Sequence, residues 1–448
     1  MAKRSQFSWL FKYFLKLWNS QYFVLSSTVG VGLLIFLLRM AGLFEVLELG
    51  LLDRFFRWRP PEAPEERVVV ISIDTKDVNV INSWPIPDLY ISKLLLTINE
   101  QEPRLIGLDV FRDVSVPPGK EELHKTLEQS NNIIAIEKLE SKDRAGVSAP
   151  PIMYEKEQVG FNDVKYDEDL KVRRNFIISI PNGTEQPRLS LSYILALDYL
   201  AAEGIVSEPT NNNFKLGKAS FPRINSNTGA YAYEDASGYQ LLSNFLDPRL
   251  IPMVSMTEVL ERKIPPNFFK NKIVLIGFTD EINKDLFAIP YLGRDFNHTD
   301  QDSQSRAVFV SGVELHANFT AQILRSALDG RPILWSPPLY WEFTLIMVWA
   351  IAGGNLIYLL RSKLISYLFL ALILGLIGII NYGVFCGFGW WIPSISQATS
   401  LMVSAIAITG YIAYQELELQ RSKKFLQSVI DKIPDPILLK IPNTVGLY

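Results

Sequence analysis

Five residues of this sequence have the chemistry to form a ligand or metal site. Glu314 and His316 stand two residues apart in the stretch GVELHANFTAQIL, and Asp74, Asp109 and Asp280 each follow a run of apolar residues. Carboxylates and imidazole bind metal ions and exchange protons near neutral pH, so together they can line a binding pocket. These five are therefore the candidate ligand-binding residues.

Each candidate also has a structural alternative. Asp is a favoured residue at helix N-termini, so Asp74 and Asp109 can cap the helices or turns after their strands, and we favour this interpretation. The spacing of Glu314 and His316 differs from HExxH, in which positions i and i+4 place two metal ligands on one helical face. We therefore expect a structural hydrogen bond from His316 across the first turn of its helix, and no metal site.

Composition excludes several classes of function. The chain has 448 residues, a formal net charge of −3 and one cysteine, Cys386. The charge gives no indication of nucleic-acid binding, and one cysteine excludes an intramolecular disulfide, a CxxC pair and a cysteine-based zinc site. The sequence has no G-x-S-x-G nucleophile motif and no GxxxxGK[ST] or GxGxxG phosphate motif. We expect no nucleic-acid partner and no cofactor.

The elements that must position the candidates alternate between strands and helices. Several short apolar runs are continuous rather than alternating, which is typical of strands covered on both faces. Apolar residues at helical spacing predict helices over 89–101 and 189–204. This order predicts an α/β fold with a mixed, mostly parallel sheet flanked by helices, whose ligands lie at the carboxyl ends of the strands. The predicted strands are 67–74, 104–110, 131–139, 175–180 and 272–279.

Four apolar segments are long enough to cross a membrane, which takes about 20 residues. Residues 17–38 carry no charge, and no Asp, Glu, Lys or Arg occurs between Lys363 and Glu416. The latter stretch is too long for one helix and divides at the GFGWWIPS turn. The first segment is expected to be an uncleaved anchor, because no A-x-A cleavage site follows it. The predicted transmembrane helices are 20–40, 338–360, 364–385 and 391–414.

Basic residues next to these segments predict their orientation. Lys and Arg occur in the N-terminal segment 1–19, between the second and third helices, and after the fourth. Positive charge marks the cytoplasmic side. The sequence thus predicts a protein of the bacterial inner membrane with both termini in the cytoplasm. Residues 45–334 would form an extracytoplasmic domain, periplasmic or extracellular.

The segment after the last membrane helix, 415–433, is predicted to be a cytoplasmic signalling helix. Its apolar heptad spacing is typical of a short parallel coiled coil, so we expect a homodimer. The alternative is an amphipathic helix that lies on lipid or on a neighbouring domain. The residues expected to relay a signal are Ile412, Leu419, Leu426, Val429 and Ile433.

The middle of the chain contains a series of longer motifs in a fixed order. They are LLDRFFRWRP (51–60), VVVISID (68–74), SWPIPDLY (83–90), IGLDVF (106–111), DEDLKVRRNF (167–176), ASGYQLLSNF (236–245), VSMTEVLERKIPPNFFKNKIVLIGFT (254–279) and SGVELHANFTAQIL (311–324). In these motifs the chain resembles the type-two CHASE domain, the sensory extracellular domain associated with cyclases and histidine kinases. One membrane helix before this domain and three after it is also the arrangement that the family implies. The resemblance implies a receptor input module of a two-component type, which detects a small-molecule or protein stimulus.

The last motif of the chain is FLQSVIDKIPDPILLK (425–440). It resembles the first helix and strand of a PAS domain, so 434–448 would be a truncated start of such a domain. The output would be a PAS-linked histidine kinase or nucleotide cyclase missing from this chain, which would itself not be an enzyme. Two rival hypotheses remain. One is a membrane-anchored periplasmic enzyme with a metal held by Asp74, Asp109, Glu314 and His316, and the other is an adaptor that binds a partner protein.

Overall fold

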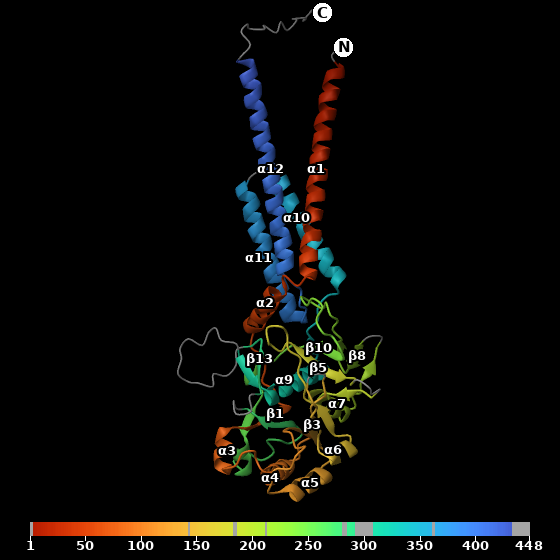
Figure 1. Ribbon diagram of the computed structural model, residues 1–448, viewed down its shortest axis with the longest axis vertical. Helices are drawn as coiled ribbons and strands as arrows, with labels where there is room; N and C mark the ends of the chain where they lie inside the picture. Colours follow the sequence, from red (N-terminus) through yellow and green to blue (C-terminus); the bar gives the residue numbers. More distant parts are fainter. Residues whose placement is uncertain are drawn as a thin grey trace, which may run out of the picture. The chain divides into compact units, whose positions relative to one another are not determined.

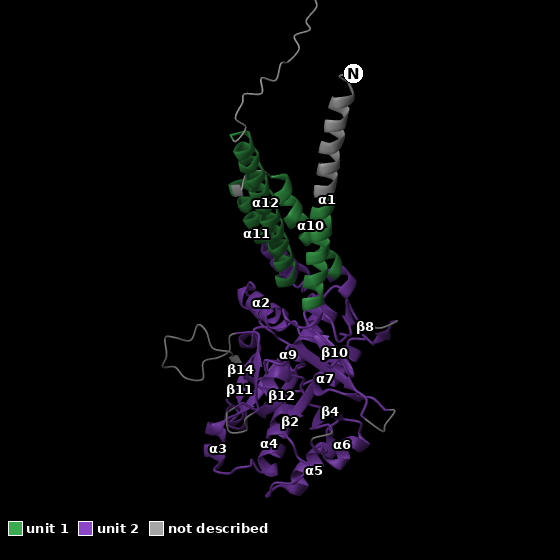
Figure 2. Cartoon of the chain, turned by 45° about the horizontal axis from the view of Figure 1, so that its top comes forward, with its two compact units in different colours: residues 1–38, 343–377, 395–448 green, residues 39–342, 378–394 purple. Residues whose placement is uncertain are grey.

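The computed structural model describes residues 3–141, 144–181, 186–210, 213–279, 285–291, 308–360 and 363–431. The chain divides into two compact units, which Figure 2 shows in green and purple. The helical unit consists of residues 1–38, 343–377 and 395–448, and the α/β unit consists of residues 39–342 and 378–394.

Within the described residues, the central sheet of the α/β unit has six strands in the order β11-β1-β12-β2-β3-β4. Every neighbouring pair is parallel. All residues of β1, β2 and β3 are buried, as expected for continuous apolar runs covered on both faces. The strands are β1 (Val68–Ile73), β2 (Leu105–Asp109), β3 (Ile133–Glu137), β4 (Val159–Phe161), β11 (Met253–Ser255) and β12 (Ile273–Phe278).

Helices cover both faces of this sheet (Figure 1). The helices that connect successive parallel strands pack on one face, because the connections all advance across the sheet in the same direction and share one hand. These helices are α3 (Thr75–Ile81), α4 (Asp88–Asn99), α5 (Lys120–Gln129), α6 (Pro151–Glu155) and α8 (Met256–Leu260). The opposite face is covered by α7 (Leu191–Ala201) and α9 (Gly312–Leu324).

Helix α9 is buried along its whole length. Its Val313 packs on β12, where a Cβ added to Gly277 would lie 2.6 Å from the Val313 Cβ. A larger residue at Gly277 would push the helix away from the sheet. After α9 the chain continues as a π-helix, Arg325–Asp329.

The remaining strands form small antiparallel sheets. Strand β5 (Arg174–Ser179) corresponds to the predicted strand 175–180, but it pairs with β10 and β6 and not with the central sheet. Its last two residues are only partly buried, so the apolar run did not indicate which sheet it joins. The other members are β6 (Arg188–Leu189), β7 (Glu208–Pro209), β8 (Asn213–Leu216), β9 (Ala219–Pro222), β10 (Tyr239–Leu242), β13 (Leu286–Ile289) and β14 (Val308–Ser311), with the 3-10 turn η1 (Pro248–Leu250).

A third apolar core of the α/β unit surrounds α2 (Glu45–Trp58). Phe56 of α2 and Phe319 of α9 belong to it, as do Phe385 and Trp391 from the segment 378–394. Helix α9 therefore packs against the sheet with one set of side chains and against this third core with another.

In the part of the chain that the structure describes, four helices are long and apolar enough to cross a membrane. The first is the stretch Gln21–Met40 of α1 (Lys3–Met40), and the others are α10 (Leu339–Leu359), α11 (Lys363–Phe388, apolar from Leu364) and α12 (Ile395–Ile430). These helices and the parallel sheet confirm the predicted combination of an α/β fold with several apolar helices.

Small and polar residues pack the helical unit. The Trp349 indole donates to Gln397 Oε1 at 3.0 Å, and the Ser400 hydroxyl donates to the Ile346 carbonyl at 2.6 Å, so α10 and α12 share hydrogen bonds. Helices of this unit also approach closely at a small residue. Gly354 lies against Thr28 and Ser404, which leaves no room for a Cβ. Close contacts at small residues and buried polar links are typical of helices that associate in lipid.

Helix α12 runs without interruption from the apolar segment into the predicted signalling segment. The side chains of Leu419 and Leu426 are 53% and 57% exposed, and Val429 is 43% exposed. Ile433 lies outside the described residues.

Candidate functional site

Two of the predicted site residues form helix caps. Asp74 accepts hydrogen bonds from the Lys76 and Asp77 amides at 2.8 and 3.0 Å, and the Asp77 carboxylate accepts from the Asp74 amide at 2.9 Å. Glu314 accepts from the Ser311 amide and hydroxyl at 3.0 and 2.9 Å. Both carboxylates complete capping boxes, of α3 and α9 respectively.

The structure brings Asp109 and His316 to one place, around Asn162. Asp109 Oδ1 accepts from Asn162 Nδ2 at 3.1 Å, and the His316 imidazole is hydrogen-bonded to the Asn162 backbone. Asp280 lies outside the described residues.

His316 lines a cavity of about 260 Å³ at the carboxyl edge of the central sheet. Phe111, Lys138 and Asn162 line it from the segments that follow β2, β3 and β4. Ligands of open α/β sheets are found at this edge. The described residues that line this cavity, the His316 pocket, are Phe111, Lys138, Arg144, Asn162, Asp163, Val164, Tyr166, Asp285, Phe287 and His316.

The His316 side chain is buried and only partly satisfied. The residue is 3% exposed, and its Nδ1 has no hydrogen-bond partner among the described residues. Burial lowers the pKa of His316 from 6.5 to about 4, although the nearby Asp285 favours the charged ring. The ring is therefore neutral at pH 7 and presents a nitrogen lone pair.

Two carboxyl groups near the pocket hold protons more tightly than usual. Burial raises the pKa of Asp109 to about 6, although the Asn162 amide opposes this change. Burial, followed by the charge of Asp109, also raises the pKa of Asp285. The Asp285 carboxylate lies where a Cβ on Gly312 would be, so glycine at the start of α9 permits this position.

The pocket also contains cations and aromatic rings. Arg144 pairs with Asp163 at 3.0 Å. Lys138 lies near enough for its charge to act on Asp109, Asp285 and His316. The rings of Tyr166 and Phe287 stack at a centroid distance of 5.7 Å. The lining thus combines both signs of charge with one aromatic wall.

Two of the four residues in the metal-site hypothesis, Asp74 and Glu314, use their carboxylates to complete capping boxes. Within the described ranges, no three His, Cys, Asp or Glu residues are arranged to hold a metal ion.

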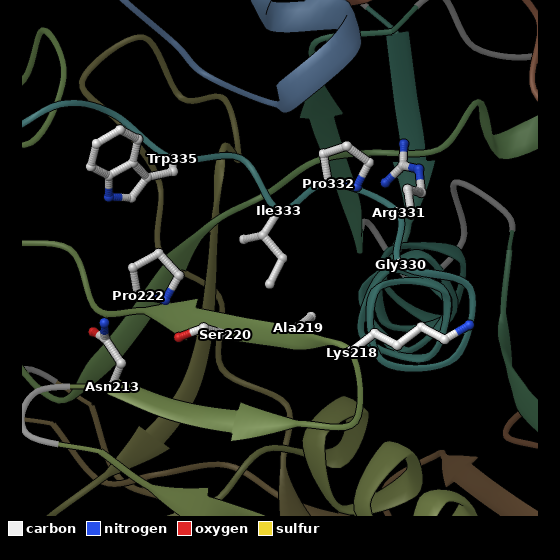
Figure 3. Close-up of a pocket in the computed structure, with 10 residues that line it drawn as sticks. All are labelled: Asn213, Lys218, Ala219, Ser220, Pro222, Gly330, Arg331, Pro332, Ile333 and Trp335. Atoms are coloured by element: carbon white, nitrogen blue, oxygen red, sulfur yellow. The ribbon is translucent and has the colours of Figure 1, made fainter.

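A second cavity, of about 360 Å³, lies between β9 and the segment 330–335 (Figure 3). Its Arg331 guanidinium already donates to both carboxylate oxygens of Glu62 at 2.7 Å. None of its lining residues has a buried side-chain N or O atom without a hydrogen-bond partner within the described ranges, whereas the His316 pocket has two, His316 Nδ1 and Asn162 Oδ1.

A buried ion network ties α2 to the start of β5. Arg173 and Asp53 are each 2% exposed, and they join through hydrogen bonds of 2.8 and 3.0 Å. Arg173 also donates to Asp167 and Asp169, and Lys171 donates to Asp53 at 2.5 Å. Burial disfavours the charge of Arg173, but the bonds and charges of Asp169 and Asp53 raise its pKa.

Asp167 extends this network to other segments. It accepts from Arg174 Nε at 2.9 Å and from the Tyr231 hydroxyl at 3.0 Å. Arg174 in turn donates to Glu234 at 2.9 Å. We call these groups the Asp53 network (Asp53, Asp167, Asp169, Lys171, Arg173, Arg174, Tyr231 and Glu234).

Residues at the ends of the apolar helices also have specific partners within the α/β unit. Arg39, in the last turn of α1, donates to Glu342 of α10 at 2.8 Å and to the backbone carbonyls of Tyr231 and Gly229. The Ser394 amide, just before α12, donates to Glu48 of α2 at 2.8 Å.

The Trp391 side chain fixes the turn between α11 and α12. Its ring packs on Gly229, where a Cβ would overlap it, and lies edge-on to Tyr231 at 5.9 Å. Its amide donates to the Trp335 carbonyl at 2.7 Å. Arg39, Gly229, Tyr231, Glu342 and Trp391 are called the helix-end cluster.

A series of ring contacts leads from the His316 pocket to the end of α11. His316 lies 6.2 Å from Phe319, and Phe319 lies 5.8 Å from Phe245. Phe245 lies 6.2 Å from Phe56, which contacts Phe385 edge-on at 5.2 Å. Pocket and helix end are thus connected through packed aromatic side chains.

Sequence patterns pointed to only part of this site. Asn162 and Lys138 were missed because they follow short strands without a functional motif, and Asp285 was missed because it stands in a stretch of sequence rich in charged residues. The signal that could have identified Asn162 and Lys138 was their position directly after short apolar strands. The Asp53–Arg173 pair joins residues 120 positions apart, which no local pattern reveals.

The chain thus combines a parallel α/β unit that contains a polar pocket with helices apolar enough to suggest membrane association. A model of the CHASE2 domain family matches residues 30–355, so this chain belongs to the CHASE2 domain family. CHASE2 domains are sensory domains of receptors and detect extracytoplasmic signals. Comparison with curated proteins and with solved structures found no match.

Proposed function

We propose that this chain is the input module of a membrane receptor and is not itself an enzyme. The α/β domain lies outside the cytoplasmic membrane and binds a small-molecule or protein stimulus. The apolar helices relay its state to a PAS-linked histidine kinase or nucleotide cyclase.

The observation that carries the proposal is the series of ring contacts from His316 to Phe385. Packed cores repack between discrete arrangements and do not deform gradually, so a change at the pocket can alter the helix end. A ligand shifts such an equilibrium only by its difference in affinity for the two states. About 1–3 kcal/mol is sufficient for useful coupling.

The helix-end cluster supports the same proposal. Within the α/β unit, Arg39 donates to Glu342 and to the Tyr231 carbonyl, and Trp391 packs on Gly229. A change in the segment around Tyr231 would therefore alter the surroundings of three helix ends together.

The output side of the proposal is a homodimer joined through α12. Leu419, Leu426 and Val429 leave an exposed apolar seam on a continuous helix, and a second copy would cover it as a parallel coiled coil. Oxidative cross-linking in membranes tests this in a Cys386→Ser background. Leu419→Cys is expected to give disulfide-linked dimers, whereas Lys424→Cys, on the outer face of the heptad, is expected to give few. Equal yields would contradict the seam.

The relay is tested by fusing residues 1–433 to a histidine kinase output. One residue inserted after Leu419 rotates the following helix by about 100°. Insertions of one, two or four residues should change the output, and an insertion of seven should restore it, because it adds about two full turns. A kinase output that stays the same after all four insertions would contradict the relay.

The proposed topology is tested separately by reporter fusions. A periplasm-only reporter is expected to be active after Gly330 and inactive after Lys363, because positive charge marks the cytoplasmic side. Activity after Lys363 would contradict the orientation.

A further inference from the structure

We propose that the His316 pocket binds a small zwitterion that carries a primary amino group and a carboxylate, as free amino acids do. This deepens the proposed sensory function by naming the chemical class of the stimulus. The binding step stands on the pocket alone, and only its consequence for output rests on the proposed function.

The amino group is indicated by unsatisfied acceptors. His316 Nδ1 and Asn162 Oδ1 are buried and have no hydrogen-bond partner in the described part of the chain. A buried polar atom without a partner is unfavourable, so a ligand donor that reaches it gains affinity. Asp285 lines the same cavity and adds a carboxylate. An ammonium group has three N–H donors and no acceptor, which matches these three acceptors.

The neutral state of His316 makes Nδ1 available as an acceptor. The hydrogen bond to the Asn162 backbone uses the other ring nitrogen as a donor. A neutral imidazole has one donor and one acceptor nitrogen, so Nδ1 keeps its lone pair. A ligand N–H can therefore bind there without displacing an existing bond.

The carboxylate is indicated by the two cations. Lys138 and Arg144 both line the cavity, and Arg144 already pairs with Asp163. A ligand with only an ammonium group would be repelled by Lys138, and one with only a carboxylate would be repelled by Asp285. A zwitterion places each charge next to its opposite.

The size of the cavity limits the ligand. Its volume of about 260 Å³ is below the usual range for drug-sized ligands, roughly 300–1,000 Å³. A nucleotide or a peptide of several residues would exceed it. The stacked rings of Tyr166 and Phe287 offer an apolar surface for a short side chain.

The test is thermal unfolding of the full chain in nanodiscs with each of the twenty L-amino acids at millimolar concentration. At least one is expected to raise Tm by about 2 °C or more, because a ligand bound only by the folded state stabilises it. The corresponding amine without the carboxylate, and the acid without the amino group, should give much smaller shifts. The proposal is overturned if no amino acid stabilises the chain, or if Zn²⁺ or Mn²⁺ does so through His316 instead.

Variants on the two sides of the pocket test the assignment of each charge. Asp285→Asn and Lys138→Gln should each weaken the apparent affinity for the stabilising amino acid at least tenfold. Asp198→Asn on α7 and Lys93→Gln on α4 are matched controls, since both side chains are exposed outside the pocket. Unchanged affinity in both pocket variants overturns the site, and if one variant fails to fold, the other still decides.

The kinase fusion separates this inference from the proposed function. If the output responds to helix insertions but the chain binds no amino acid, the proposed ligand is wrong and the sensory function is still supported. Binding that never changes output would support the site and contradict the relay.

Discussion

The Asp53 network and the His316 pocket are built from similar polar residues but differ in how far their hydrogen bonds are satisfied. In the network, Arg173 donates to Asp53, Asp167 and Asp169, and both carboxylate oxygens of Asp53 accept bonds. In the pocket, His316 Nδ1 and Asn162 Oδ1 have no partners among the residues that the structure describes.

The difference separates groups that hold the fold from groups that can bind a ligand. A satisfied buried network fixes the segments that it joins, and removal of one member leaves charges without partners. A partly satisfied pocket lowers stability slightly and keeps donors and acceptors available. Substitutions should therefore cost mainly stability in the network and mainly ligand binding in the pocket.

The largest expected effect is the loss of Asp53. Asp53→Ala leaves the Arg173 and Lys171 charges without a principal partner and should destabilise the folded state by about 3–5 kcal/mol. Chemical unfolding of the full chain in detergent measures this. The control is Asp329→Ala, because Asp329 is 53% exposed in its ion pair with Arg67 and should contribute at most about 1 kcal/mol. Equal losses of stability in both variants would show that the buried Asp53 network contributes no more than an exposed ion pair.

Two glycine-to-alanine substitutions compare a crowded position at the pocket, Gly312, with an open position on α2, Gly50. A Cβ on Gly312 would overlap the Asp285 carboxylate, whereas a Cβ on Gly50 of α2 would meet nothing within 4 Å. Gly312→Ala should cost about 1–3 kcal/mol through overpacking and weaken amino-acid binding. Gly50→Ala should instead stabilise α2 by roughly 0.5–1 kcal/mol. Thermal unfolding and ligand titration measure both effects, and unchanged binding in Gly312→Ala would contradict the role given to Asp285.

The pH dependence of stability should reveal the pocket groups. Burial raises the pKa of Asp109 to about 6 from 3.8, so its contribution to stability is complete below pH 3.8 and is lost as the pH rises through 6. Burial lowers the pKa of His316 to about 4 from 6.5. Its contribution is therefore complete above pH 6.5 and is lost as the pH falls through 4.

Removal of Asp109 and removal of His316 should therefore change the pH dependence of stability in opposite directions. Relative to the unsubstituted chain, the free energy of unfolding of Asp109→Asn should increase by on the order of 1–3 kcal/mol when the pH rises from 4 to 7. The free energy of unfolding of His316→Gln should increase, relative to the same chain, when the pH falls over this interval. Unfolding at pH 4 and pH 7 measures both, and parallel curves for all three chains would contradict the burial of these groups.

Among the candidate site residues, the smallest expected loss of stability belongs to the helix caps. Asp74→Ala and Glu314→Ala each remove part of a capping box and should cost about 0.5–2 kcal/mol. Asp74→Ala should leave the affinity of the pocket unchanged, as measured by the same titration. Loss of binding in Asp74→Ala would indicate a ligand role that its hydrogen bonds do not suggest.

The sequence predicted the parts of this structure that depend on local patterns. Continuous apolar runs indicated β1, β2, β3 and β12, because a strand buried on both faces needs no polar residues. The S-x-x-E pattern of Ser311 and Glu314 and the D-x-x-D pattern of Asp74 and Asp77 are readable as capping boxes. The run that became β5 was indistinguishable from a strand of the central sheet.

The site was predicted only where a candidate ended a strand or carried a titratable group on a helix, as Asp109 and His316 do. The pocket itself depends on loops after β3 and β4 and on Asp285, which meet only in the folded chain. Likewise, Arg39 meets Glu342 across 303 residues. Such long-range contacts follow from packing and leave no short-range pattern.

The central claim is that the state of the His316 pocket is transmitted to the ends of the apolar helices. Hydrogen–deuterium exchange of the full chain in nanodiscs tests it through the Trp391 and Ser394 amides, which donate to Trp335 and Glu48. Exchange in peptides that cover 378–394 should be several-fold faster in His316→Ala and unchanged in His124→Ala, a matched exposed histidine on α5. Unchanged exchange there in His316→Ala, despite faster exchange in α9, would contradict the account.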